Sequence, residues 1–171
     1  MISQAMQDTF NKQINEELFS AYLYVSMANY FEHTSLKGFA HWMRLQSEEE
    51  LAHTRRFVTY LNDRGGRVVL DAIAAPQIEW DSPLAAFEAA YEHECHISAC
   101  INAMVTQSVE EKDHASHAFL EWFVTEQVEE EANADDIVQQ LKLMDGAPGG
   151  IFMMDRELAQ RSASADPAPA E

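Results

Sequence analysis

The sequence predicts an all-α protein: a bundle of four long helices, with a long crossover between the second and third helices and a short fifth helix near the C-terminus. Three observations predict this fold class. The 171 residues, 47% of them hydrophobic, are enough for one globular domain with a sizeable core. Only six glycines and five prolines are present, which favours helices over a turn-rich sheet protein. Along four long stretches, core-type residues recur at alternating spacings of three and four, as on helices that face a bundle interior.

The first two helices form a predicted hairpin followed by the crossover. The helical pattern runs from about residue 3 to 33, and Thr34-Ser35 indicates a break that supplies an N-cap for the next helix. That helix extends to about residue 62. The stretch 65–81, GGRVVLDAIAAPQIEWD, loses the helical period and contains Gly-Gly, Pro and a short β-branched run. It is therefore predicted to be a long connection.

The second hairpin has clearer start signals. Ser82-Pro83 provides an N-cap with proline at the first helical position, and the third helix runs to about residue 109. Asp113 is a plausible N-cap for a fourth helix that reaches about residue 144 and ends at the turn-forming DGAPGG.

The C-terminal region completes a single predicted domain, residues 1–161. A short fifth helix is expected from about Ile151 to Gln160. Residues 162–171, SASADPAPAE, have too little apolar content to order themselves and are expected to form a disordered tail.

Charge and composition restrict the partners. A net charge of −18 with eleven lysines and arginines excludes duplex nucleic acid as an expected partner and favours cations. The N-terminus has no basic segment followed by an apolar run, and no stretch approaches the ~18 consecutive apolar residues of a membrane span. Cys95 and Cys100, five residues apart, match neither a disulfide framework nor a CxxC motif. We therefore expect a soluble, cytoplasmic protein with no membrane partner.

Each long helix carries a predicted core-facing series that is interrupted near its middle by carboxylate. The four series are Phe10, Ile14, Glu17, Ala21, Tyr24, Ala28 and Phe31; Phe39, Met43, Gln46, Glu50, His53, Phe57 and Tyr60; Leu84, Phe87, Tyr91, Glu94, Ser98, Ile101 and Val105; and Leu120, Phe123, Gln127, Glu130, Ala134, Ile137, Leu141 and Met144.

Counting from the hairpin turns places these interruptions at one depth. In the first hairpin, the glutamate of the first helix lies about 17 residues before the turn near Thr34, and the glutamate and histidine of the second lie about 16 and 19 after it. The second hairpin repeats these separations around Glu111. The side chains predicted to share this cross-section are Glu17, Glu50, His53, Glu94, Gln127 and Glu130.

Four buried carboxylates with no lysine or arginine in any series favour a metal site. Unpaired charges in a core cost several kcal/mol per ion, and multivalent cations compensate them. Carboxylate oxygens with a single imidazole suit iron or manganese. Taken singly, each glutamate could be a protonated or water-bonded core residue, and His53 a satisfied core histidine. The joint pattern on four helices instead predicts a pair of metal ions, towards which Glu50 and His53 share one helix face.

Four motifs make the chain resemble a known family: NEELFSAYLY, SEEELAHTRR, YEHE and WFVTEQVEEE. From about Phe10 to Arg161 the sequence is similar to the ferritins, and in particular to the non-haem prokaryotic-type ferritins. The resemblance implies a ferritin-like four-helix bundle with an intrasubunit di-iron ferroxidase centre, at which dioxygen oxidises iron(II). It implies Glu17, Glu50 and His53 around the first iron and Glu50, Glu94 and Glu130 around the second, with Glu50 bridging and Gln127 hydrogen-bonding nearby.

Two further roles follow only from the resemblance. Tyr24, seven residues from Glu17 in the same series, could donate an electron to the centre, or it could be a core tyrosine with a satisfied hydroxyl. Glu49, Glu126 and Glu129 would form a third iron site shared with Glu130, the alternative being a solvated acidic face.

One difference from the bacterioferritins bears on the expected cofactor. Leu51 stands where bacterioferritins place their methionine axial ligand, so no haem is expected. The resemblance implies a hollow homo-oligomeric cage of twenty-four subunits in which the fifth helix lines a pore and ferric mineral is stored. Two alternatives stay open: a di-iron oxidase or oxygenase acting on an organic substrate, and a catalytically silent cage subunit that only buffers iron.

Overall fold

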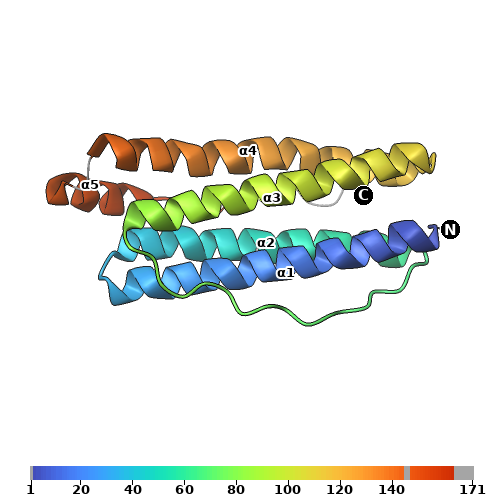
Figure 1. Cartoon of the computed structure of the whole chain (residues 1–171), viewed down its shortest axis with the longest axis horizontal. Coiled ribbons are helices and arrows are strands. Elements are labelled where there is room, and N and C mark those ends of the chain that lie inside the picture. The colour runs from blue at the N-terminus through green and yellow to red at the C-terminus, as the bar shows by residue number, and fades with distance from the viewer. Residues whose placement is uncertain (1, 145–146, 164–171) are drawn as a thin grey trace.

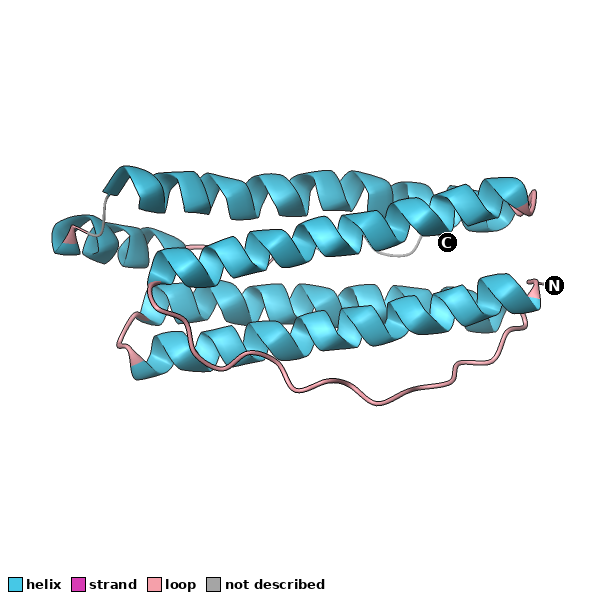
Figure 2. Ribbon diagram, in the orientation of Figure 1, coloured by secondary structure: helices cyan, strands magenta, loops and turns pink. Residues whose placement is uncertain are grey.

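The computed structural model describes residues 2–144 and 147–163, and within them it confirms the all-α fold class. Four long helices form two antiparallel hairpins (Figures 1 and 2). No helix in the described part of the chain is both long and apolar enough to cross a membrane. The helices are α1 (Gln4–His33), α2 (Lys37–Asp63), α3 (Pro83–Glu110), α4 (His114–Met144) and α5 (Pro148–Leu158).

The starts of α3 and α4 follow from local sequence, as predicted. The Ser82 side chain accepts a hydrogen bond from the backbone N–H of Ala85 (3.1 Å), with Pro83 opening the helix. Asp113 Oδ1 accepts from the N–H of Ser116 (3.2 Å), and Asp113 also pairs with Arg64, the residue that follows α2 (3.0 Å). The second hairpin turn is therefore held to the first hairpin.

The start of α2 differs from the prediction. Its N-cap position is Leu36, which makes no side-chain cap, and neither Thr34 nor Ser35 caps the helix. Instead, Asp155 of α5 accepts hydrogen bonds from the backbone N–H groups of Gly38 (2.7 Å) and Phe39 (3.1 Å). The carboxylate thus satisfies the first N–H groups of α2 from another helix and lies at the positive end of the helix dipole.

The position of α5 also differs slightly from the prediction. The helix begins at Pro148, three residues before the expected start at Ile151, and its last residue is Leu158. Proline suits the first helical position because its missing N–H would have no intrahelical partner there. Residues 145–146 of the predicted turn and residues 164–171 of the predicted tail lie outside the described part of the chain.

The crossover, residues 64–82, runs along the first hairpin without a helix, as expected (Figure 2). Gly65 adopts a left-handed backbone (φ 72°) directly after α2, which ends the helix. Asn11 of α1 donates to the carbonyl of Arg67 (3.1 Å) and accepts from the N–H of Val69 (2.9 Å). Side chains of α1 therefore hold the extended segment in place.

The core consists of two apolar clusters separated by a polar layer. One cluster includes Tyr24, Phe31 and Phe87, and the other includes Phe57 and Phe123. In every long helix the predicted carboxylate falls between residues of the first cluster and residues of the second. The bundle interior is thus divided at the depth that the turn counting predicts.

One predicted core series is only half right. On α3, Phe87, Glu94 and Ile101 are buried as expected. The predicted intermediate positions, Leu84, Tyr91, Ser98 and Val105, are half-buried, whereas Ala90, Ile97 and Met104 are buried instead. Each of these two sets combines with the three correctly predicted residues into a series with spacings of three and four. The helical period alone therefore could not decide which set faces the core.

Candidate metal centre

All four long helices contribute side chains to the polar layer. α1 supplies Glu17 and Tyr24, and the remaining residues come from the other three helices. The seven predicted residues are each no more than 5% exposed: Glu17, Tyr24, Glu50, His53, Glu94, Gln127 and Glu130.

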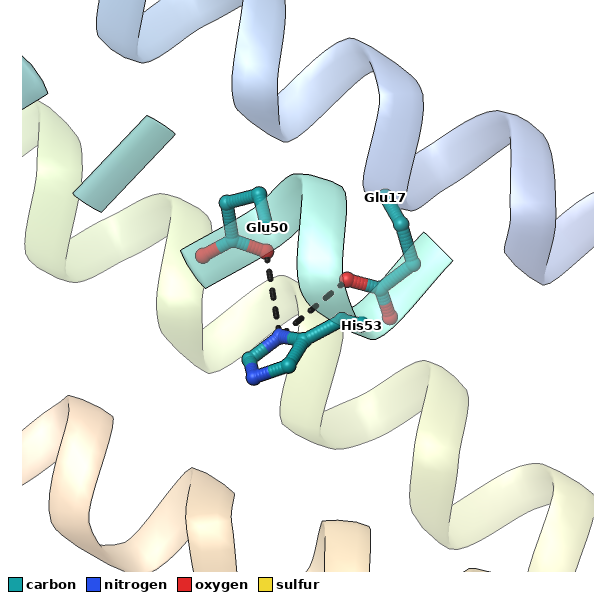
Figure 3. Close-up of side chains that lie close together, drawn as sticks. All are labelled: Glu17, Glu50 and His53. Carbon is teal, nitrogen blue, oxygen red and sulfur yellow. Dashed lines mark ion pairs between the residues drawn. The ribbon is translucent and has the colours of Figure 1, made fainter. Parts of the chain in front are cut away.

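The most compact group joins α1 and α2. His53 Nδ1 lies 3.4 Å from Glu50 Oε2 and 3.6 Å from Glu17 Oε2 (Figure 3). One ligand atom from each residue falls within 4.8 Å of the others, a spacing at which all three could bind one metal ion. Glu17 Oε1 accepts a hydrogen bond from Gln13 (2.8 Å), but the buried Glu17 Oε2 accepts none. A buried carboxylate oxygen without a donor is poorly stabilised, which indicates a position for a cation.

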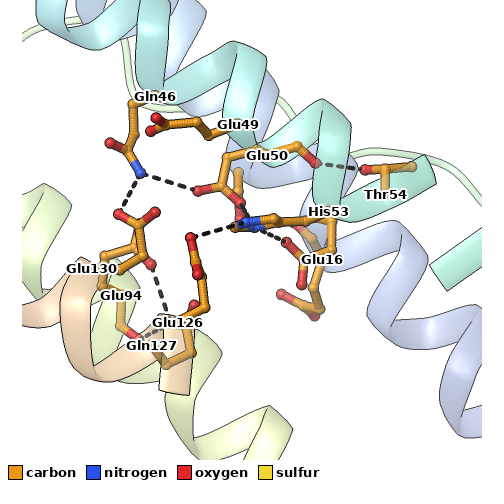
Figure 4. Close-up of polar contacts among 12 residues, drawn as sticks. Glu16, Gln46, Glu49, Glu50, His53, Thr54, Glu94, Glu126, Gln127 and Glu130 are labelled. Atoms are coloured by element: carbon orange, nitrogen blue, oxygen red, sulfur yellow. Dashed lines mark hydrogen bonds and ion pairs between the residues drawn. The ribbon is translucent and has the colours of Figure 1, made fainter. Parts of the chain in front are cut away.

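A second compact group lies on the other side of the imidazole. Glu126 Oε1 is 3.9 Å from His53 Nε2, and ligand atoms of His53, Glu126 and Glu130 fall within 4.8 Å of one another. Glu130 Oε2 accepts a hydrogen bond from Gln46 Nε2 (2.6 Å), and the same nitrogen lies 3.5 Å from Glu50 Oε1 (Figure 4). Gln46 therefore bridges two of the predicted ligands.

Glu94 faces a different set of partners. One of its carboxylate oxygens accepts a hydrogen bond from the Tyr24 hydroxyl, and the other accepts from Gln127 Nε2 (3.3 Å). Glu94 belongs to neither compact group found among the described residues. The structure thus brings Tyr24, Glu94 and Gln127 together, but it does not gather Glu50, Glu94 and Glu130 as tightly as the residues of the first group.

The residues expected at a third site are more exposed and more dispersed. The side chain of Glu126 is 28% exposed and faces His53, while Glu129 is solvent-exposed. Glu49 Oε2 pairs with Arg161 Nη2 at 2.6 Å, and neither Glu49 nor Glu129 belongs to the two compact groups.

Burial and mutual repulsion shift the acid–base equilibria of the layer. Burial, followed by the negative charge of Glu94, raises the pKa of Glu130 to about 8 and raises the pKa of Glu50 well above its usual value. Burial and Glu94 also raise the pKa of Tyr24 well above its usual value. Burial lowers the pKa of His53, but the facing Glu17 and Glu50 carboxylates outweigh it, so this pKa lies well above its ordinary value. Without metal, the layer therefore retains protons at neutral pH.

This donor set fits a hard, multivalent cation. It combines carboxylate oxygens with one imidazole and no thiolate, a combination suited to iron or manganese. A metal ion entering the layer would displace the proton that Glu130 holds through its raised pKa of about 8, and it would supply positive charge without requiring buried lysine or arginine.

Two contacts around the layer were not predicted as part of the site. Gln46 belongs to the predicted core series of the second helix, but it was not predicted to donate to Glu50 and Glu130. The only sequence signal for this role is that Gln46 lies close to the depth of these two carboxylates in the bundle. Arg161 follows α5 and donates to Gln46 Oε1 (2.9 Å) as well as to Glu49. No local sequence signal connects residue 161 with this layer.

Comparison with known proteins gives one consistent answer. The family model described as ferritin-like domain matches residues 7–144. The chain is 45% identical to a bacterial non-heme ferritin of Bacteroides fragilis over 161 residues, which covers 94% of this chain and all of that protein. It is 35% identical to a bacterial non-heme ferritin of Campylobacter jejuni, with 91% and 93% of the two chains covered. The structure resembles that of an open pore ferritin from Archaeoglobus fulgidus with a TM-score of 0.94 and 49% sequence identity, covering 95% of this chain and all of that one. The chain belongs to the ferritin family.

Proposed function

We propose that the protein is an iron-storage ferritin that takes up iron(II), oxidises it with dioxygen within each subunit and stores the product as ferric mineral. The observation that carries this proposal is the buried layer in which four helices present carboxylates and one imidazole between two apolar clusters. Membership of the ferritin family supports iron as the metal.

In the proposed centre, Glu17, Glu50 and His53 bind the first iron ion. The short distances among these three residues, and the buried Glu17 oxygen that accepts no hydrogen bond, support this assignment. Anionic oxygen ligands bind iron(III) more strongly than iron(II), because the higher charge gains more from each carboxylate. The same ligands therefore favour oxidation of the bound ion.

The second iron ion is assigned to Glu50, Glu94 and Glu130, with Glu50 shared between the two ions. Glu94 would have to release at least part of its hydrogen bonding to Tyr24 and Gln127 when it binds metal. Rotation of the Glu94 carboxylate would release these contacts. Tyr24, whose hydroxyl contacts Glu94, is the proposed electron donor to the oxidised centre.

A third, more exposed iron site is assigned to Glu49, Glu126 and Glu129 together with Glu130. The proximity of Glu126 to both His53 and Glu130 supports this site, because it places a solvent-accessible carboxylate next to the buried layer. Iron could pass between the centre and the outside of the bundle along these groups.

We further propose that the chain folds as one domain, residues 1–161, and assembles into a cytoplasmic homo-oligomeric cage of twenty-four subunits. Large apolar side chains are exposed where α1 and α2 meet the crossover, including Tyr22, Val25 and Ile73. On α5, Phe152 and Met153 are also exposed. Burial of such side chains between subunits is a strong driving force for assembly.

The experiment that tests the proposed reaction is rapid-mixing absorbance after adding two iron(II) ions per subunit to the metal-free protein in air. The wild-type protein should oxidise iron in a fast phase that Glu50→Ala abolishes, because Glu50 is shared by both ions. Glu48→Ala is the matched control, since it removes an exposed glutamate from the same helix and should retain the fast phase. Oxidation no faster than in buffer for all three proteins would refute ferroxidase activity.

A further inference from the structure

Arg161, which follows α5, connects the C-terminal segment with the metal-binding layer through two hydrogen bonds. Its guanidinium lies over the Trp42 ring, 4.5 Å from the ring centroid, with Nη2 2.6 Å from Glu49 Oε2 and Nη1 2.9 Å from Gln46 Oε1. The side chains of Arg161 and Glu49 are only 19% and 16% exposed. A partly buried, charge-assisted pair supported by an aromatic ring is more than a solvated surface contact.

The pair affects a residue that the proposed third site requires. Glu126 and Glu130 form a compact group with His53, whereas Glu49 lies outside that group with its carboxylate bound to Arg161. In Figure 4 the Glu49 carboxylate lies on the Gln46 side of the layer, away from Glu126. A metal ion that uses Glu49 must therefore compete with the guanidinium for the negative charge of this carboxylate.

Arg161 also orients an amide in the layer. Guanidinium groups donate hydrogen bonds and accept none, so the oxygen of Gln46 must face Arg161. The amide nitrogen then faces inward, where it donates to Glu130 (2.6 Å) and approaches Glu50 (3.5 Å). One side chain beyond α5 is thus connected to both the exposed and the buried parts of the metal-binding layer.

We propose that Arg161 is a displaceable counter-cation for the third metal site: it occupies Glu49 in the metal-free protein and is released when a divalent cation binds there. This inference rests on the third site of the proposed function. Since the coupling is reciprocal, Arg161 weakens binding of the third ion, and the third ion loosens attachment of the segment after α5.

Zinc(II), which does not change oxidation state, is the probe for calorimetric titration of the metal-free assembled protein. The wild type should bind zinc at the buried centre and, more weakly, at a third site that Glu49→Gln removes. Arg161→Gln should tighten the weaker site by about tenfold, within the usual range of coupling between sites. Arg161→Lys should restore most of the wild-type affinity, because it keeps the charge beside Glu49 while losing the forked contact.

Arg156→Gln is the matched control, because it removes the same charge from an exposed position on α5. An unchanged third-site affinity in Arg161→Gln, or an equal gain in Arg156→Gln, would overturn the proposal. In the Glu49→Gln background, Arg161→Gln should have no further effect, and a persistent gain there would also overturn it. Absence of buried-centre binding in the wild type, with no difference from Glu50→Ala, would instead reject the proposed function on which the inference rests.

Hydrogen exchange supplies a second readout. Zinc at a level that fills the third site should increase exchange of backbone amides at residues 159–163 in the wild type, because release of Arg161 frees this segment. In Glu49→Gln the same zinc concentration should leave that exchange unchanged. Equal responses in both proteins would contradict displacement of Arg161 from Glu49.

Discussion

Replacing Glu130 by glutamine should stabilise the metal-free protein while weakening its metal binding. The substitution keeps the size of the side chain and an oxygen that can accept from Gln46, which donates to Glu130 at 2.6 Å. It removes a carboxyl group that is only 5% exposed and has a pKa raised to about 8 by burial and by the charge of Glu94. The folded protein thus holds a proton that the unfolded chain has released.

The sign and size of this effect follow from proton linkage. Between the ordinary pKa of 4.5 and the raised value of about 8, the folded state binds more protons, so the free energy of unfolding falls as the pH rises. Glutamine needs no proton to be neutral. Glu130→Gln should therefore raise the free energy of unfolding by about 1 kcal/mol at pH 5 and by about 3 kcal/mol at pH 7.

Urea unfolding of the metal-free protein, followed by circular dichroism at several pH values in the presence of a chelator, measures this difference. Glu48→Gln serves as the control, because it makes the same chemical change at an exposed position on α2. A stability gain that is the same at pH 5 and pH 7 would refute the reasoning, since only a raised carboxyl pKa makes the gain grow with pH. Added zinc should stabilise the wild type more than the variant, because metal binding to the folded state contributes in proportion to its affinity.

Two further predictions concern the helix ends that frame the site. Gly38→Ala should displace α5, because the added Cβ would lie 1.6 Å from the backbone oxygen of Asp155. Hydrogen exchange at residues 148–158 should then accelerate. It should stay unchanged in the control Gly149→Ala, whose added Cβ would meet nothing within 4 Å. Asp113→Ala should lower the free energy of unfolding by about 1–2 kcal/mol through loss of the α4 cap. The hydrogen bonds from Ser116 and Arg64 lower the pKa of Asp113, although burial opposes this shift. The stabilisation by Asp113 is therefore present above pH 3.8 and is lost as the pH falls through the lowered pKa. A stability difference between wild type and variant that persists under strong acid would contradict this reasoning.

The parts of the fold that sequence reasoning predicts well are those controlled by neighbouring residues. Ser82 and Asp113 cap helices that begin at the next residue, so local chemistry is sufficient there. Equal depth of the ligand-type residues follows from helix geometry, because each residue advances the chain by the same rise. A count from each turn therefore places six side chains in one layer without knowledge of their contacts.

The parts that sequence reasoning misses depend on partners distant in the chain. The first N–H groups of α2 are capped by Asp155, more than a hundred residues away, and no local pattern connects the two. Arg161 likewise contacts Glu49 and Gln46, which lie more than a hundred residues earlier in the chain, because α5 packs against α2. On α3, the helical period allows two adjacent stripes, and packing against the other helices decides that Ile97 rather than Ser98 is buried.

The arrangement of the core explains how the chain can fold with an unfavourable layer at its centre. Several buried carboxylates lower the stability of the metal-free protein, but aromatic clusters lie on both sides of them, with Phe57 stacked on Phe123 at 4.1 Å on one side and Phe31 against Phe39 at 5.1 Å on the other. Because each cluster is continuous across several helices, the layer is held in place even when metal is absent. The carboxylates are then preorganised for a cation. A bound cation relieves the repulsion among them, and this relief adds to its binding free energy. Neutralising one of them should therefore change stability and metal affinity in opposite directions.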